Sequence, residues 1–440
     1  MENYRKSMLL VILQWAVPII LFLSAFFLEH VDYIYNSAAM SELGFFYLLF
    51  TPFDYGIIPT IYPLSVNVNA FAITKRSNKF IVWKTMFVVS IAYLILCILS
   101  FLMSSGKTGD YLLYSVGATT QYLALTWNGM PYLFETMVSL CTYSAVIVLL
   151  RSIIRNILHN DFYATIINTL VFLSINSYLP NAGLGKWKPY CIAYTWIGSH
   201  NGFVEKYIIQ AISIGLLLLI LLCTKQLKNK NYKFGIKKAM LYSVVIGALC
   251  GVYRQYIFFT NINAFEALIT TMQYNESNNV GRYEEEIIAV SIIITGAYGI
   301  LKYNRENQRK QYYGKSLAMC IVYILLFELG IFLSALLHGK KIDCVSFGYI
   351  LEIASISMRL FAGCFIVNRM CLMLQDYMDC DMCCFAILCI LIINIFITIV
   401  MCSSVEALSL SNMRNYINTA FAISMCCIFA FVNVIQRIRN

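Results

Sequence analysis

Long apolar segments alternate with short polar ones along almost the whole chain. A helix needs ~20 mostly apolar residues to cross the hydrocarbon core of a bilayer, where backbone groups can be hydrogen-bonded only within the helix. The pattern predicts spans at Met8–Leu28, Tyr55–Phe71, Phe80–Met103, Leu133–Ile154, Phe162–Leu179, Glu205–Thr224, Ala239–Phe259, Glu284–Leu301, Ser316–Leu337, Ser346–Leu372, Cys383–Cys402 and Tyr416–Gln436. The predicted fold class is an all-α polytopic membrane protein with about twelve transmembrane helices.

The hydrophobic blocks and basic loops occur twice in the same order. A shift of about 231 positions lays the first predicted span on the seventh and the second on the eighth, and it brings Lys79 onto Lys310. We therefore expect two six-helix repeats, at residues 1–228 and 229–440. Because each repeat holds an even number of spans, the two should have the same orientation in the membrane and form a pseudo-dimer.

Composition and charge support a membrane protein. The chain is 60% hydrophobic and 12% charged, whereas soluble domains are roughly 25% charged. The formal net charge is +10. Most Lys and Arg fall on one side of the predicted bundle, as the positive-inside rule expects of the cytoplasm, so we predict no nucleic-acid partner. Met8–Leu28 is expected to be a retained span, because no small-residue cleavage site precedes His30.

Cysteine and histidine give no strong metal signature. Most of the 16 cysteines lie in apolar runs, where a thiol behaves as a small hydrophobe. Cys380, Cys383 and Cys384 form one CxxC with an added cysteine, but no second pair or nearby histidine accompanies them. Structural zinc sites need four ligands, so we predict no metal site and leave the role of this cluster open.

Two short basic stretches lie between long apolar segments, at matching places in the two repeats. The first basic stretch is Ile73–Lys84 (ITKRSNKFIVWK), and the second basic stretch is Asn304–Lys315 (NRENQRKQYYGK). Each combines basic with aromatic residues, which is typical of an amphipathic element at the inner membrane surface. One such stretch alone fits an interfacial anchor. Two equivalent stretches in parallel repeats also fit the docking surface of a two-fold symmetric partner.

The order of these features carries a family resemblance. A cytoplasmic N-terminus is followed by two spans, a basic amphipathic loop, four more spans and an apolar segment, Tyr190–Ser199 (YCIAYTWIGS), before the sixth. The loops end in Trp83-Lys84 and Gly314-Lys315. This arrangement resembles the permease of ABC-2-type ABC exporters, which usually has Gly-Lys at the foot of the third helix and an extracellular re-entrant helix at the place of the apolar segment.

The resemblance implies a multi-pass protein of the bacterial cell membrane with both termini in the cytoplasm. It also implies a separate ABC ATPase subunit, in two copies, that binds ATP and Mg²⁺, and an exported peptide, such as a bacteriocin or other antimicrobial, or an amphipathic substrate. The residues expected to dock the ATPase are Arg76, Lys79, Phe80, Trp83, Lys84, Arg309, Lys310, Tyr312, Tyr313 and Lys315.

This chain itself is not expected to hydrolyse ATP. Gly314-Lys315-Ser316 has the end of a phosphate-binding loop, but that motif requires a glycine five residues before its Gly-Lys, where Arg309 stands, and a preceding buried strand. We therefore predict no enzymatic activity and no cofactor in this chain.

Ionisable residues within predicted spans are costly and therefore candidates for function. The candidates in the second predicted repeat are Arg254, Glu328, Glu352 and Arg359. Glu328 could pair with Arg359 or Arg254 to satisfy each charge inside the bundle, or these residues could handle substrate or protons. Both interpretations stay open at this point.

Membrane proteins of other classes are the alternatives. A polysaccharide polymerase would be expected to have a large outer loop with catalytic basic residues, whereas the outer loops here reach only about 25 residues. A polysaccharide flippase or ion-coupled secondary transporter would also have two parallel halves, but with polar residues in matched helices of both.

Overall fold

The computed structural model describes a subset of the chain. The described residues are 67, 87, 91, 95, 111–112, 124–125, 145–178, 203–225, 236–258, 263–272, 294–302, 313–342, 346–374 and 384. Contacts between residues divide the chain into two compact units, Met1–Asn231 and Tyr232–Asn440, and each is described by itself. This division lies close to the predicted boundary after residue 228, and the relation of the two units as repeats stays a prediction.

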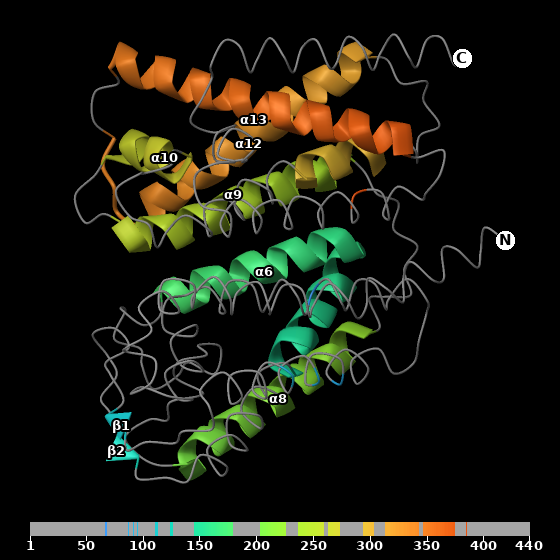
Figure 1. Ribbon diagram of the computed structural model, residues 1–440, viewed down its shortest axis with the longest axis vertical. Coiled ribbons are helices and arrows are strands. Elements are labelled where there is room, and N and C mark those ends of the chain that lie inside the picture. Colours follow the sequence, from blue (N-terminus) through green and yellow to red (C-terminus); the bar gives the residue numbers. More distant parts are fainter. Residues whose placement is uncertain are drawn as a thin grey trace, which may run out of the picture. The chain divides into compact units, whose positions relative to one another are not determined.

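The first unit contains a helical hairpin and a separate long helix (Figure 1). Residues 145–158 are helical, and α6 (Asp161–Tyr178) and α8 (Phe203–Lys225) follow. Strands β1 (Tyr111–Leu112) and β2 (Ala124–Leu125) pair antiparallel, with Tyr111 opposite Leu125.

A two-residue turn closes the hairpin. His159 has φ 57°, in the left-handed region, and its N–H donates to Arg155 O at 2.8 Å. Asn160 caps the next helix, because its Oδ1 accepts from Tyr163 N at 2.9 Å and its carbonyl accepts from Ala164 N at 3.1 Å. Asn is a preferred N-cap, and the acidic Asp161 in the first turn complements the helix dipole. These bonds set where the hairpin turns.

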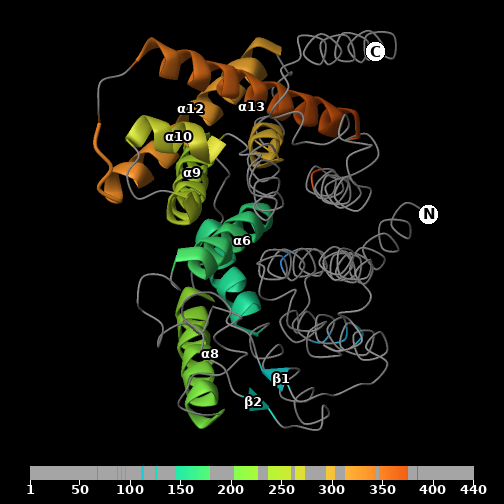
Figure 2. The ribbon, with the colours of Figure 1, turned by 60° about the vertical axis from the view of Figure 1, so that its left-hand side comes forward.

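The second unit is built on α9 (Ile236–Phe258) and α12 (Tyr313–Leu337), which pack along each other (Figure 2). The short α10 (Ala264–Met272) contacts α9, α12 and α13 (Phe347–Leu374), and α13 also contacts α12. Residues 294–302 are helical as well.

Glycines bring the backbones of α9 and α12 together. A Cβ on Gly247 would lie 2.1 Å from Phe327 O, and a Cβ on Gly330 would lie 2.2 Å from Val244 O. One turn before Gly247, Ser243 Oγ donates to Tyr323 O at 2.7 Å. Small residues four apart permit such close contact between helices. Since the contacting positions rise together along both helices, α9 and α12 run parallel. Their places as the seventh and ninth spans stay a prediction.

The C-terminal end of α12 is closed by a Schellman motif. Gly339 has φ +76°, and its N–H donates to Leu336 O at 2.9 Å while Lys340 N donates to Ala335 O at 3.2 Å. This pair of bonds, with glycine in the left-handed region, satisfies carbonyls that the helix leaves unpaired. Lys341 lies two positions after Gly339, and its carbonyl oxygen accepts a hydrogen bond from Ala264 N at 3.0 Å. This bond joins the end of α12 to the start of α10.

The all-α prediction is confirmed for the described residues, apart from the two-residue strands. Helices α6, α8, α9, α12 and α13 occupy predicted spans, and their ends differ from the predicted ones by a few residues. Two described segments, Ala318–Leu337 and Phe347–Phe365, are long and apolar enough to cross a membrane, with mean hydropathy 2.5 and 1.3. The total of about twelve spans stays a prediction. The sequence analysis missed α10, β1 and β2.

The contact between α9 and α12 can be tested with one added methyl group. We expect Gly330→Ala to lower the thermal unfolding midpoint in detergent, at a cost of about 1–3 kcal/mol, because its Cβ meets rigid backbone. Gly215→Ala in α8 is the matched control, since nothing lies within 4 Å of its Cβ. There the better helix propensity of alanine should leave the midpoint unchanged or raise it. Equal effects of the two substitutions would contradict the packing described.

Candidate functional site

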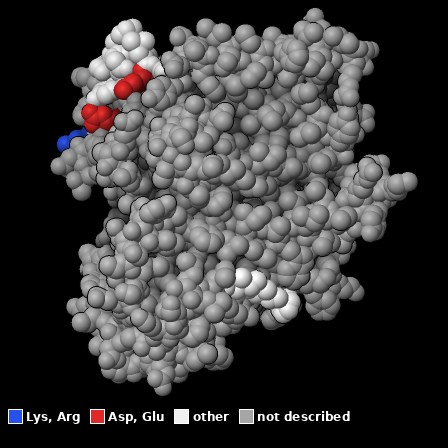
Figure 3. Space-filling model, viewed as in Figure 1, with Lys and Arg blue, Asp and Glu red and all other residues white. Residues whose placement is uncertain are grey.

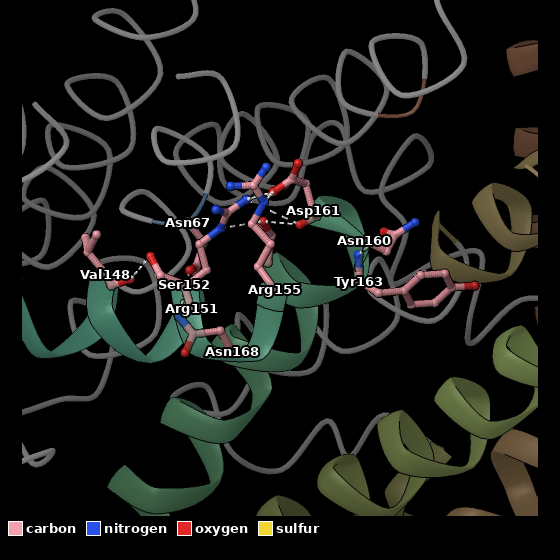
Figure 4. A network of polar contacts seen from close by, with 10 residues as sticks. Asn67, Val148, Arg151, Ser152, Arg155, Asn160, Asp161, Tyr163 and Asn168 are labelled. Carbon is pink, nitrogen blue, oxygen red and sulfur yellow. Dashed lines mark hydrogen bonds and ion pairs between the residues drawn. The ribbon is translucent and has the colours of Figure 1, made fainter. Parts of the chain in front are cut away.

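A network of polar side chains joins the hairpin helices of the first unit (Figure 4). The hairpin network, as we define it, comprises Asn67, Arg151, Arg155, Asp161, Thr165, Asn168 and Thr169. Arginines and asparagines are costly to bury among apolar helices unless each polar atom has a partner. The positions of these side chains are therefore set by one another.

Two arginines share one carboxylate at the turn of the hairpin. The side chain of Arg151 is 1% exposed, and its Nη2 lies 3.1 Å from Asp161 Oδ1. Arg155 Nε lies 2.6 Å from the same oxygen, and the Arg155 side chain is 26% exposed. The spacing explains the geometry, because Arg151 and Arg155 are four apart and so lie on one face of their helix. Asp161, in the first turn of α6, faces both.

Arg151 also contacts α6 one turn further along. Its Nε donates to Thr165 Oγ1 at 3.4 Å, and Thr165 Oγ1 donates to Asp161 O at 2.8 Å. A second weak contact joins Arg151 Nη2 to the Asp161 carbonyl at 3.5 Å. One carboxylate between two guanidinium groups leaves a net positive charge at this turn.

Amide groups continue the network deeper into the hairpin. Asn168 Nδ2 donates to Asn67 Oδ1 at 2.6 Å and lies 3.3 Å from Ile147 O. In return, Asn67 Nδ2 donates to Thr169 Oγ1 at 2.8 Å. Asn67 and Asn168 are fully buried. Asn67 belongs to the predicted span that leads into the first basic stretch, so these bonds tie that span to α6.

The hairpin network can fix the two helices relative to each other and can stabilise the buried charge of Arg151. Thr169 Oγ1 donates to Thr165 O at 3.0 Å, and this bond joins the amide part of the network to the ionic part. Asn168 Oδ1 is buried and has no hydrogen-bond partner among the described residues. The network therefore keeps one unused acceptor.

Most of this network was not predicted from the sequence. Arg151 and Arg155 were counted only among the Lys and Arg that fall on the predicted cytoplasmic side, and no role was predicted for Asn67, Asn168 or Asp161. A usable signal was present at the turn, where Asn-Asp between two apolar runs predicts a helix N-cap with an acidic first turn. The Asn67–Asn168 pair had no local signal, since the two residues are 101 positions apart.

The second unit buries one carboxyl group at the contact between α12 and α13. Glu328 is 6% exposed, and a hydrogen bond joins its Oε1 to Ser357 Oγ. One and a half turns before Glu328, Tyr323 Oη lies 2.6 Å from Thr295 Oγ1. Asn368 Nδ2 of α13 donates to Ala297 O at 3.2 Å. Polar groups thus link α12 and α13 to the helix at residues 294–302.

The other predicted intramembrane charges are placed only in part. Glu352 is exposed on α13. The side chains of Arg254 on α9 and of Arg359 on α13 lie outside the described residues. The pairing of Glu328 with either arginine therefore stays a prediction, and Ser357 is the partner that the described residues give to Glu328.

The predicted docking residues lie mostly outside the described part of the chain. This holds for Arg76, Lys79, Phe80, Trp83, Lys84, Arg309, Lys310 and Tyr312. Tyr313 and Lys315 form the first turn of α12, which begins three residues before the predicted span, and their side chains are outside the described set. The docking surface stays a prediction.

Metal ligands do not gather among the residues that the structure describes, where no group of three or more His, Cys, Asp or Glu could hold an ion. Of the cysteine cluster, Cys384 is buried, while Cys380 and Cys383 lie outside the described residues. Comparison with family models, with curated proteins and with solved structures gives no match to the chain. The comparisons therefore give no support to the resemblance to ABC-2 permeases, which stays a prediction.

The two arginines of the hairpin network form a matched pair for mutation. We expect Arg151→Gln to destabilise the protein by about 3 kcal/mol, because it breaks a buried pair. Arg155→Gln, at a partly exposed position on the same carboxylate, should cost less than about 1 kcal/mol. Thermal unfolding of the purified variants in one detergent measures both. A larger loss at Arg155 than at Arg151 would contradict the burial described.

Proposed function

We propose that the chain is the membrane-spanning permease subunit of an ABC exporter, which moves a peptide or amphipathic substrate out of a bacterial cell with the energy of ATP hydrolysed by a separate subunit. The membrane part of the proposal is supported by the exposed face of α12, which is apolar. Leu325, Leu329 and Leu333 are exposed along this face, while Glu328 is buried among apolar residues such as Phe327. An apolar exposed face suits lipid as the solvent.

Charged and polar groups of the second unit also support the membrane part of the proposal. In Figure 3, the acidic and basic atoms of the described residues on this face lie close together at one corner, beside described residues that are uncharged. Tyr349 Oη donates to Glu266 Oε1 at 2.6 Å, and the exposed Lys341 bonds the start of α10 through its carbonyl. Polar groups thus collect at the C-terminal end of α12, where a membrane–water interface is expected.

The exporter part of the proposal rests on the repeat pattern and on the two basic stretches. Two equivalent cytoplasmic loops suit a pair of ATPase subunits that close on ATP and move the loops, and this movement would change the gap between the repeats. The peptide or amphipathic cargo follows from the family resemblance, not from a particular residue.

An ion-coupled secondary transporter is the second candidate. The observation that favours it is the buried carboxyl of Glu328, since intramembrane acidic residues often serve proton or ion pathways. Such a transporter would need no ATPase and would work under an ion gradient.

Purification of the chain from its native host in mild detergent separates the two candidates. We expect an ATPase subunit to copurify in a fixed ratio, and ATP-dependent export by the complex in vesicles. A chain that purifies alone and transports under an ion gradient would contradict the proposal.

Charge reversal tests the docking surface. We expect Lys79→Glu with Lys84→Glu, or Arg309→Glu with Lys310→Glu, to reduce ATPase recovery at least tenfold, because each pair would repel a complementary surface. Lys340→Glu with Lys341→Glu, at the opposite end of α12, is the control and should leave recovery unchanged. An unchanged yield for both docking variants would refute this docking surface.

A further inference from the structure

Ser357 lies between two oxygen atoms that both usually accept hydrogen bonds. Its Oγ is 2.7 Å from Ile353 O, one turn earlier in α13, and it is also hydrogen-bonded to Glu328 Oε1 of α12. A serine hydroxyl has one hydrogen and two lone pairs. It can donate fully to one of these oxygens and can only accept at the other.

The Ile353 carbonyl cannot supply the second hydrogen, because a carbonyl is an acceptor only. An ionised carboxylate is also an acceptor only, whereas a protonated carboxyl group has an O–H that donates. The two contacts are both satisfied when Ser357 donates to Ile353 O and Glu328 donates to Ser357 Oγ. Each of the two contacts then has one hydrogen, one donor and one acceptor, and no further group is needed to satisfy them.

The surroundings of Glu328 favour the neutral form. Glu328 is 6% exposed, and burial away from water disfavours a charged carboxylate. Charged and titratable residues of the packed helices are Lys237, Lys238, Tyr242, Cys250, Tyr253, Arg254 and Tyr256 of α9, Glu266 of α10, Tyr298 and Lys302 of the helix at residues 294–302, and Tyr349, Glu352, Arg359, Cys364, Arg369 and Cys371 of α13.

The backbone positions of the two candidate arginines differ from that of the contact between Glu328 and Ser357. Gly247 of α9 lies level with Phe327, so Arg254 is about two turns further along than Glu328. Arg359 is two positions after Ser357, and residues two apart do not share a helix face. Among the described residues the partner of Glu328 is Ser357, and a buried carboxylate that has no counter-ion is costly.

We propose that Glu328 is a proton-binding site, with the carboxyl group protonated while α12 packs on α13 and its O–H donated to Ser357 Oγ. Loss of the proton would place a charge and an unmatched pair of acceptors between the two helices. Proton occupancy and the α12–α13 contact are therefore linked. The proposal rests on α12 and α13 being packed as described, and it is independent of whether an ATPase drives transport.

Infrared difference spectroscopy of the purified chain at neutral pH tests this directly. We expect the C=O band of a protonated carboxyl group, shifted by deuterium exchange, to be present in the native chain and lost in Glu328→Gln. Glu352→Gln, at the exposed acid on the same helix pair, is the control and should keep the band. Ser357→Ala should keep the band at a shifted frequency, because the carboxyl group loses its hydrogen-bond partner. A native spectrum without a band that depends on Glu328 would overturn the proposal.

Thermal unfolding gives a second test. Because an amide can replace a protonated carboxyl group as a donor, Glu328→Gln should move the unfolding midpoint by less than about 2 °C, whereas Glu328→Ala should lower it by at least about 4 °C. Equal losses in both variants would indicate that the negative charge itself is required, and would contradict a neutral Glu328. Neither measurement uses an ATPase. The results for Glu328 can therefore be interpreted even if the exporter proposal fails.

Discussion

A polar group between apolar helices has no water to bond, so it must find its partner on a neighbouring helix. This constraint fixes the contacts in both units. In the first unit, Asp161 forms ion pairs with Arg151 and Arg155, and the buried pair Asn67 and Asn168 extends the network. In the second, the polar contacts of α12 reach three neighbours, the helix at residues 294–302, α9 and α13. The register of each helix pair follows from these bonds.

Close packing of helix backbones adds dispersion contacts to the polar contacts. At Gly247 and Gly330 the backbones of α9 and α12 meet without intervening side chains, so the two helices can gain dispersion contacts over their length. The same helix presents Leu325 and Leu329 outward. An apolar outer face is unfavourable in water and suited to lipid, which is the environment that the proposed function gives to this helix.

Much of the helix layout could be predicted from hydropathy, because each span must be apolar for its full length. Helix α6 begins where Asn160 is the N-cap and Asp161 is the acidic residue of the first turn. This Asn-Asp pair can be recognised as a helix start from the sequence alone. Nine-residue α10 was missed because it is too short for a span, although Asn263 and Glu266 form a reciprocal cap at its start. The partners of Asn67 and Glu328 could not be predicted, since they depend on packing between distant segments.

The proposed function requires that α9 and α12, which run parallel, cross a membrane in the same direction. It is tested most directly by the accessibility of Lys237→Cys, at the start of α9, and Lys341→Cys, just after α12, both at exposed positions. A membrane-impermeant thiol reagent, added outside intact cells, should modify the cysteine at position 341 and leave the cysteine at position 237 unmodified until the membrane is opened. The native cysteines are controlled by the unsubstituted chain. Modification of both positions from the same side of the membrane would contradict the account.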